Sequence, residues 1–489
     1  MKINGIKENT IFIDGVWREA AGGKTEAVLN PATLEHIMSF SYGDEKDARL
    51  AVQAAKDALP LWSAKTARER SGYLYRAYQL MMERQEDLAV ILTTEQGKPL
   101  AESRGEIASA ASYLLWYAEE ANRIYGEMIP SSNKGKRLFT IPQPIGVVAA
   151  ITPWNFPSSM IARKLGPALA AGCTVVLKPA EQTPLSAVGL VKIFEEAGLP
   201  KGVLNLVTGD PASIGKAWLE EQDVRLITFT GSTEVGKHLM RSSADNVKKL
   251  SLELGGHAPI LVFEDADIDQ AVSLSLMSKF RNAGQTCICA NRIYVQESIY
   301  NHFVKKLVEK VKQLKMGNGL ETGIEIGPLI DNHALEKVQS HVQDAINKGA
   351  SITAGGNRPS LSKNLKGFYY TPTVLTGITD EMLVMKEETF GPVVPIQSFT
   401  SEEEAIEKAN LTSYGLASYV FTENINRAWR VMEQLEYGII GINDVFPAAA
   451  EAPFGGIKQS GQGKEGGREG MMEYVEMKYI SMGLKEAEY

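Results

Sequence analysis

Two cysteines stand close together in a segment that joins a predicted helix to a predicted strand. The chain has three cysteines in 489 residues, and Cys287 and Cys289 lie two positions apart between Phe280 and Asn291. A substrate can reach a thiol at such a boundary, and nearby backbone N–H dipoles favour its ionised, nucleophilic form. The pair therefore indicates covalent chemistry on a cysteine, with two small core residues as the alternative.

Neither a metal site nor a hydrolase site is predicted at these thiols. A structural zinc ion would need a second pair of ligands. The six histidines do not stand at spacings that supply it; they are residues 36, 238, 257, 302, 333 and 341. A cysteine hydrolase would need a histidine poised beside the thiol, and His257 has no evident Asn or Asp partner.

Glu253 is the second group that could take part in chemistry. It stands in an apolar segment, 250–259, directly before Gly255 and Gly256. Apolar surroundings disfavour the charged form of a carboxyl group, which raises its pKa and prepares it to act as a base near neutral pH. The alternative is an outward-facing strand residue.

The segment 145–230 alternates short apolar runs with helical patterns. We predict strands at 145–151, 174–177, 203–207 and 225–230, and helices at 159–171, 184–197 and 212–220. Such alternation is typical of a parallel sheet covered by helices, in which ligands bind at the carboxyl ends of the strands. A dinucleotide is the ligand that this arrangement favours.

Polar and glycine-containing segments follow each of these predicted strands, at 154–157, 178–181, 208–210 and 231–236. The turn 231–236 is bounded by glycines and opens a helix, so its free N–H groups and the helix dipole could hold a pyrophosphate. Lys178 and Glu181 could together hold ribose hydroxyls. The alternatives are simple turn glycines and a solvated lysine at a strand end.

The flanking segments add helices, a second α/β block and a ribbon. We predict a hairpin at Asp14 and Gly15, helices at 45–63, 67–96 and 101–122, further helices near 267–280, 298–314 and 333–348, and strands near 368–376 and 393–397. The proline-containing segment 124–146 reads as an extended ribbon that pairs with 474–482. The ribbon could bind another subunit's sheet edge, or stay an internal edge hairpin.

Length and charge narrow the class of protein. A chain of this length exceeds one hydrophobic core, so several domains are expected. The net charge of −8 and the pI of about 5.6 argue against nucleic-acid and anionic-membrane partners. No signal peptide is evident after Met1, and the uncharged run 165–177 is broken by glycine and proline. These features and the few cysteines favour a reduced, cytoplasmic setting.

Six motifs carry a resemblance to a known family. They are 153–157 (Pro-Trp-Asn-Phe-Pro), 178–181 (Lys-Pro-Ala-Glu), 229–232 (Phe-Thr-Gly-Ser), 252–256 (Leu-Glu-Leu-Gly-Gly), 284–287 (Gly-Gln-Thr-Cys) and 388–392 (Glu-Thr-Phe-Gly-Pro). In order and spacing they resemble the aldehyde dehydrogenase superfamily, and 280–292 is most similar to the succinate-semialdehyde dehydrogenases. A non-catalytic protein that reuses this fold would be expected to lose Cys287 or Lys178, and both are present.

The resemblance implies an α/β fold with a Rossmann-type cofactor domain, an α/β catalytic domain and a β-ribbon oligomerisation arm. The boundaries that we expect are 1–123 and 147–255 for the cofactor domain, 256–469 for the catalytic domain, and 124–146 and 470–489 for the arm. The arm implies a homo-oligomer, either a dimer or a tetramer.

The resemblance also implies a role for each matching position. Cys287 would be the nucleophile, Asn155 and the Cys287 backbone N–H the oxyanion hole, and Glu253 the base that activates water. The implied cofactor-binding residues are Ile151, Thr152, Pro153, Trp154, Lys178, Glu181, Gly209, Phe229, Gly231, Ser232, Glu388 and Phe390. Whether Cys289 forms a regulatory disulfide with Cys287 stays open.

We expect NAD as the preferred cofactor, with NADP as the alternative. Glu181 can accept both ribose hydroxyls but would repel a 2′-phosphate. The cation of Lys178 would partly offset that repulsion.

The implied substrate-binding residues are Arg163, Arg281 and Phe454. A guanidinium fork suits an anion, so a short anionic aldehyde is expected, with succinate semialdehyde first. The loop 446–450 (Phe-Pro-Ala-Ala-Ala) lacks the hydroxyl residue that such enzymes often carry. Glutarate semialdehyde, a sulfonated or lactaldehyde-type short aldehyde, or a general aldehyde are the alternatives, and Arg281 could instead order the Cys287 loop.

Overall fold

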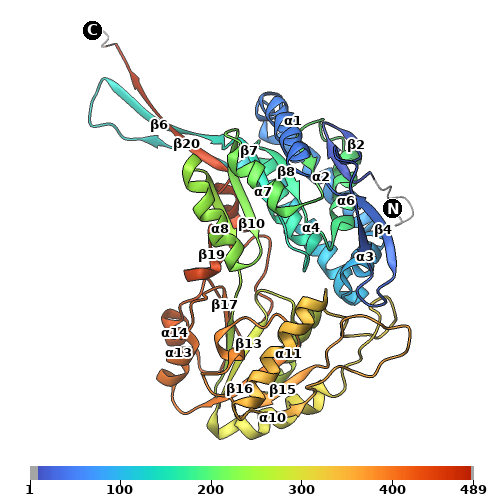
Figure 1. The fold of residues 1–489 in the computed structure, drawn as a ribbon. Coiled ribbons are helices and arrows are strands. Elements are labelled where there is room, and N and C mark those ends of the chain that lie inside the picture. The colour runs from blue at the N-terminus through green and yellow to red at the C-terminus, as the bar shows by residue number, and fades with distance from the viewer. Residues whose placement is uncertain (1–8, 486–489) are drawn as a thin grey trace.

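The computed structural model describes residues 9–485 (Figure 1). The first eight residues, where a signal peptide was sought, and residues 486–489 of the predicted arm lie outside the described residues. Within the described part, no helix is both long enough and apolar enough to cross a membrane.

The first sheet contains the predicted parallel strands. In spatial order its strands are β19 (Gly461–Gln462), β11 (Lys249–Glu253), β10 (Val224–Thr230), β7 (Val147–Ile151), β8 (Thr174–Lys178), β9 (Leu204–Leu206), β1 (Ile11–Ile13) and β2 (Val16–Arg18). From β11 to β9 the neighbours run parallel, and the two outer connections, to β19 and to β1, are antiparallel. The central strands read as continuous apolar runs because helices cover both of their faces.

The helices that accompany this sheet do not all begin at a side-chain cap. They are α1 (Glu45–Ser63), α2 (Ala67–Glu83), α3 (Gln85–Gln96), α4 (Leu100–Glu120), α5 (Pro157–Ala171), α6 (Pro184–Glu196), α7 (Pro211–Glu220) and α8 (Thr233–Ser243). Thr66 and Glu69 form a capping box at the start of α2. The prediction of one helix over 67–96 is wrong, because the chain leaves helical geometry at Arg84 (φ −114°, ψ 18°).

A second sheet forms the other half of the body. Its strands, in spatial order, are β14 (Ser351–Ala354), β15 (Thr373–Thr376), β16 (Val393–Phe399), β13 (Ala290–Gln296), β12 (Ala258–Val262), β17 (Ala417–Phe421) and β18 (Ile439–Ile442). Its helices are α9 (Ile268–Phe280), α10 (Glu297–Val311), α11 (Asn332–Asn347), α12 (Leu383–Lys386), α13 (Glu402–Asn410) and α14 (Ile425–Gln434), whereas the last helix, α15 (Gly467–Met472), packs against α4 and α5 of the first half. The strand expected at 368–376 is shorter than predicted.

A ribbon extends away from the body, as Figure 1 shows. It consists of β5 (Met128–Ile129), β6 (Lys136–Pro144) and β20 (Val475–Gly483), and β20 pairs with β6 along its whole length. The predicted pairing of these two distant segments is confirmed. A separate hairpin, β3 (Thr25–Leu29) and β4 (His36–Ser41), lies near the N-terminus.

Each sheet has its own buried apolar core. The C-terminal residues Met471, Tyr474 and Val475 pack into the core of the first sheet, and β19 joins that sheet's edge. The chain thus returns to its first half before it enters the ribbon. The domain boundaries given above stay a prediction.

Candidate active site

Strand register brings the predicted site segments to one edge of the first sheet. Ile151, at the end of β7, pairs with Lys178 on β8 and with Phe229 on β10. Thr230 in turn pairs with Glu253, the last residue of β11. The segments that follow these strands therefore begin side by side, as expected for the carboxyl edge of a parallel sheet.

The loop that carries Cys287 is held in a special backbone conformation. Asn282, Ala283 and Gly284 all have positive φ angles (50°, 54° and 78°). A Cβ on Gly284 would lie 2.2 Å from the Gly391 carbonyl oxygen, and one on Gly256 would lie 2.3 Å from the Cys287 carbonyl oxygen. Glycine is required at both contacts, so the loop is fixed by its neighbours.

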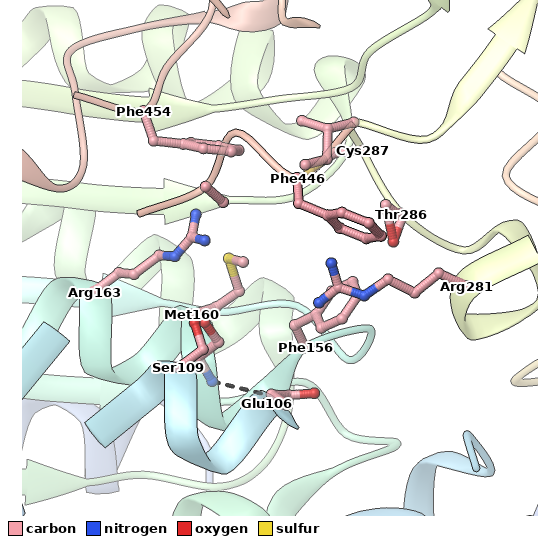
Figure 2. A pocket seen from close by; sticks show the side chains of 13 residues that line it. Glu106, Ser109, Phe156, Met160, Arg163, Arg281, Thr286, Cys287, Phe446 and Phe454 are labelled. Atoms are coloured by element: carbon pink, nitrogen blue, oxygen red, sulfur yellow. Dashed lines mark hydrogen bonds between the residues drawn. The ribbon is translucent and has the colours of Figure 1, made fainter. Parts of the chain in front are cut away.

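Cys287 is half-buried and lies between two cavities. The first, the arginine cavity, has a volume of about 80 Å³ and is lined by residues that include Arg163, Arg281 and Phe454 (Figure 2). The second, the strand-end cavity, has a volume of about 290 Å³ and is lined in part by residues of the strand-end segments. Cys287 and Met160 line both cavities, so the thiol can meet ligands from two sides.

The Cys287 thiol is protonated near neutral pH. Burial raises its pKa to about 12; the charge of Glu388 adds to that rise, and the cation of Arg163 opposes it. A thiol in this state needs a base that accepts its proton when it attacks. All three cysteines of the chain are free.

Glu253 is buried, with 3% of its surface exposed, so the outward-facing alternative is wrong. Neither carboxyl oxygen has a hydrogen-bond partner among the described residues. Burial raises the pKa of this carboxyl group well above its ordinary value, and the neighbouring charge of Glu465 adds to the rise. Glu253 lines neither cavity and stands behind the nucleophile loop at the end of β11.

Asn155 lines the strand-end cavity, and its amide is oriented by two hydrogen bonds. The Oδ1 atom accepts from the Phe156 N–H at 3.0 Å, and Nδ2 donates to the Gln285 carbonyl at 3.1 Å. One Nδ2 hydrogen remains for another acceptor, because an amide nitrogen carries two.

Two guanidinium groups enter the arginine cavity (Figure 2). Arg163 is buried between the rings of Tyr113 and Phe454, at 4.7 and 4.5 Å from their centroids. Its Nε and Nη1 atoms have no hydrogen-bond partner, and Glu465 lies 3.7 Å from Nη1. Arg281 lies 4.8 Å from the Phe156 ring, and no hydrogen bond or ion pair joins its side chain to another described residue. The cavity therefore has guanidinium donors available for an anion.

The predicted cofactor residues fall into two groups. Those that line the strand-end cavity are Pro153, Trp154, Gly231, Ser232, Glu388 and Phe390. Those that stand at the strand ends outside it are Ile151, Thr152, Lys178, Glu181, Gly209 and Phe229.

Two residues of the second group, Lys178 and Gly209, have contacts that show their structural roles. Lys178 is buried, and its ammonium group contacts the Pro179 carbonyl at 3.0 Å and the Glu181 carboxylate, so it is not a solvated charge. A Cβ on Gly209 would lie 2.1 Å from the Gly43 carbonyl oxygen, so this glycine permits close backbone packing.

Glu388 and Phe390 shape the far wall of the strand-end cavity. Glu388 accepts a hydrogen bond from the Gly256 N–H at 3.1 Å, and burial raises the pKa of its carboxyl group to about 7. Phe390 has a positive φ of 54° and meets Trp154 edge to face, with ring centroids 5.6 Å apart. The unfavourable backbone angle places this ring against the β7 segment.

Sequence analysis missed several residues that line the cavities. His333 and Lys337 reach the strand-end cavity from α11 in the second half of the chain. Glu106 and Met160 line the arginine cavity from α4 and α5. Only Met160 had a usable signal, because α5 directly follows the Asn155 segment.

The comparison with known families decides the identity of this arrangement. The model described as "Aldehyde dehydrogenase family" matches residues 17–480. The chain belongs to the aldehyde dehydrogenase family. The predicted family and fold class are thereby confirmed, and the protein is an enzyme that uses a nicotinamide dinucleotide.

Named aldehyde dehydrogenases are similar over nearly the whole chain. A 3-sulfolactaldehyde dehydrogenase of Pseudomonas putida is 51% identical over 483 residues, 99% of each chain. A succinate-semialdehyde dehydrogenase [NADP(+)] of Escherichia coli is 50% identical over 486 residues, 99% of this chain and 100% of that one. Betaine aldehyde dehydrogenase of Staphylococcus aureus, solved in complex with NAD+, matches with a TM-score of 0.97 at 39% identity, covering 99% of this chain and 97% of that one.

The strand-end cavity fits the dinucleotide of an aldehyde dehydrogenase. It opens at the N-terminus of α8, where the helix dipole favours phosphate oxygens, although the Gly231 N–H itself donates to the Glu253 carbonyl at 3.0 Å. It ends at Cys287, where a nicotinamide ring would meet the reacting carbon. Lys178 and Glu181 stand at the next strand end, in position to hold a ribose.

Proposed function

We propose that this aldehyde dehydrogenase oxidises a short aldehyde with an anionic far end, with succinate semialdehyde as the leading substrate. The observation that carries the proposal is the pair of guanidinium groups with unused hydrogen-bond donors in a small cavity that ends at Cys287; Arg163 also has Glu465 3.7 Å away. Two of the similar enzymes are named for aldehydes with a carboxylate or a sulfonate. Glutarate semialdehyde and sulfonated or lactaldehyde-type aldehydes share this chemistry and are the alternatives.

In the first step, the sulfur of Cys287 adds to the aldehyde carbon. The thiol proton passes to a solvent water molecule, and Glu253, whose carboxyl oxygens have no hydrogen-bond partner among the described residues, stays free for the third step. A carbon–sulfur bond forms, and the carbonyl oxygen becomes an oxyanion. The second Nδ2 hydrogen of Asn155 and the Cys287 backbone N–H stabilise that charge.

In the second step, the oxyanion electron pair re-forms the carbonyl and expels hydride, which leaves a thioester on Cys287. The bound nicotinamide dinucleotide supplies the hydride acceptor. Trp154, Glu388 and Phe390 line the space beside Cys287 and orient the ring that faces the sulfur.

In the third step, water hydrolyses the thioester. Glu253 takes a proton from the attacking water. The carbon–sulfur bond breaks, the sulfur takes up a proton and the carboxylate product leaves. Arg163 and Arg281 hold the far end of the substrate throughout.

We infer a preference for NAD over NADP. Glu181 is partly exposed and lies against the Lys178 ammonium group, which neutralises part of its charge but leaves an acceptor for ribose hydroxyls. A 2′-phosphate at this place would meet the carboxylate. The Escherichia coli relative is named for NADP(+), so kcat/KM with each dinucleotide is the test, and equal or better use of NADP would overturn the inference.

We also propose a cytoplasmic homo-oligomer. Exposed apolar side chains line the ribbon, among them Met128, Met477 and Tyr479. Self-association would cover them, as expected for exposed apolar surface. A monomeric mass in solution would contradict this. Three free cysteines and a thiol nucleophile suit a compartment that keeps thiols reduced.

The substrate proposal is tested by Arg163→Ala and Arg281→Ala, each assayed with succinate semialdehyde and with butanal. A charged hydrogen bond contributes about 1.5–3 kcal/mol, so each variant should lose roughly 10- to 200-fold in kcat/KM on the anionic substrate. Butanal, which has no charge to bind, is the internal control and should react at nearly the unchanged rate.

Two outcomes would contradict the proposal. If Arg281→Ala slows both aldehydes alike, Arg281 orders the Cys287 loop instead of binding substrate. If the unmodified enzyme prefers butanal, the protein is a general aldehyde dehydrogenase.

A further inference from the structure

Behind the arginine cavity lies a fully buried ion pair that takes no part in the steps above. Lys98, just before α4, and Glu106, on α4, have no exposed side-chain surface, and Lys98 Nζ lies 2.6 Å from Glu106 Oε2. Taking two charges out of water is costly, and a pair of this kind persists only where further hydrogen bonds compensate. The partners of these two side chains therefore show what the pair holds in place.

Glu106 holds the start of α5. Its Oε1 atom accepts from the backbone N–H groups of Ser158 at 2.9 Å and Ser159 at 3.2 Å. The residue at the N-cap position, Phe156, offers no side-chain hydrogen bond to this helix. The carboxylate of a different helix thus satisfies the orphan donors of α5 and complements its dipole.

Lys98 holds the residue that carries the oxyanion amide. Its ammonium group donates to the Asn155 carbonyl oxygen at 2.6 Å and lies 3.8 Å from the Phe156 ring centroid. The Asn155 carbonyl also accepts from Asn282 Nδ2 at 3.1 Å. One backbone oxygen therefore joins the ion pair to the loop that carries the nucleophile.

We propose that Lys98 and Glu106 are positioning residues for the oxyanion hole: together they fix the Asn155 backbone and the first turn of α5, and so aim the free Asn155 Nδ2 hydrogen at the carbonyl oxygen of the aldehyde that Cys287 attacks. This inference rests on the oxyanion role proposed above for Asn155. It assigns a catalytic consequence to two residues that have no role in that mechanism, one of which, Glu106, lines the arginine cavity.

Glu106→Gln is the primary test, because it keeps the shape of the side chain and removes the charge. A carboxylate has two acceptor oxygens, but an amide has only one. The amide in Glu106→Gln therefore cannot accept from the Lys98 ammonium group through one oxygen and from both serine N–H groups through the other. Loss of a complete oxyanion donor costs about 10²–10³ in kcat, so a misplaced donor should lower kcat roughly 10- to 100-fold. The loss should appear with anionic and neutral aldehydes alike, at saturating substrate and dinucleotide.

Glu95→Gln is the matched control. Glu95 is also a buried carboxylate that accepts from two backbone N–H groups at the start of another helix, those of Leu185 and Ser186 on α6. In the described part of the chain, no hydrogen bond or ion pair joins its side chain to Asn155 or to the nucleophile loop. Both variants should lower Tm, but only Glu106→Gln should lower kcat, and the dinucleotide Kd measured by fluorescence titration should be unchanged in Glu106→Gln.

A double-mutant cycle with Asn155→Ala separates positioning from general destabilisation. If Glu106 acts through Asn155, adding Glu106→Gln to Asn155→Ala should lower the rate of hydride transfer by less than about twofold, since coupled residues are not additive. Additive losses, or equal losses of kcat in Glu106→Gln and Glu95→Gln, would overturn the inference.

The test still gives a clear answer if Glu106→Gln does not fold or if Asn155→Ala has no effect. If Glu106→Gln does not fold, Lys98→Met with Glu106→Gln removes both charges together, and its kcat should fall as predicted for the single variant; an unchanged kcat would overturn the inference. If Asn155→Ala alone leaves hydride transfer unchanged, the proposed oxyanion role fails, and this inference fails with it. A slowed Asn155→Ala beside an unaffected Glu106→Gln would refute the positioning role alone.

Discussion

At the scale of single residues, one physical cause sets the properties of both reacting groups. Burial raises the pKa of the Cys287 thiol and the pKa of the Glu253 carboxyl group. A carboxyl group with a raised pKa is a stronger base once ionised, and a thiol with a raised pKa needs one. Glu253 is therefore suited to accept a proton from the water that hydrolyses the proposed thioester.

The raised pKa of Glu253 predicts how kcat depends on pH. The carboxyl group is a base only when deprotonated, and because its pKa is raised, deprotonation occurs at a higher pH than for an ordinary glutamate. We expect kcat to increase as the pH rises through that pKa and to be lost below it. In Glu253→Gln, a burst of reduced dinucleotide should be followed by slow turnover that lacks this rise. An undiminished steady-state rate would assign the base to another residue.

The residue types at the site could be predicted because chemistry restricts them. The proposed roles of nucleophile, base and anion binder restrict the residue types. Cys287, Glu253 and Arg163 have suitable types, and each stands in a recognisable part of the sequence. Glu106 could not be found in this way, since its role depends on backbone groups 52 and 53 positions away along the chain. No local pattern links it to Ser158 and Ser159.

At the scale of elements, the nucleophile loop shows how closely backbone geometry is specified. A residue other than glycine at positive φ costs about 1–2 kcal/mol. At Gly284 a side chain would also collide with the Gly391 carbonyl oxygen, whereas at Gly323, with a similar φ of 80°, nothing lies within 4 Å of a Cβ. Substitutions at Gly284 and Gly323 therefore distinguish the effect of backbone strain alone from the effect of strain together with displacement of the loop.

We predict that Gly284→Ala lowers kcat by more than about tenfold, because the loop must move by more than the roughly 1 Å that catalytic geometry tolerates. Gly323→Ala, the matched control, should lower Tm modestly and leave kcat unchanged. Thermal unfolding and steady-state kinetics of both variants provide the measurement. Equal activity in the two variants would show that the Gly391 contact does not position Cys287.

Elements with strong local signals were predicted well, and the others were not. Side-chain caps mark the start of α1, α2, α7 and α8, and the parallel strands of the first sheet are apolar runs, so these elements can be read from sequence. In the second sheet, strands such as β14 and β18 have four residues each and gain their stability from neighbours. The break at Arg84 has no proline or glycine to mark it.

At the scale of the whole molecule, the catalytic loop lies where the two halves of the chain meet. The first sheet supplies Asn155 and Glu253, and the second half supplies Cys287 and Phe390. Motif order placed these residues in one site, but only the structure shows that Cys287 lies between two cavities. Side chains from α4, α5 and α11 make that division, and sequence cannot give their relative position.

A competition experiment tests the proposed substrate and mechanism together. Glu253→Gln, which should form the thioester but hydrolyse it slowly, is mixed with NAD and equal concentrations of succinate semialdehyde and butanal. Peptide mass spectrometry then identifies which acyl group is bound and to which cysteine. We predict a succinyl group on Cys287. A butyryl group there, or an acyl group on Cys289 or Cys173 with Cys287 unmodified, would contradict it.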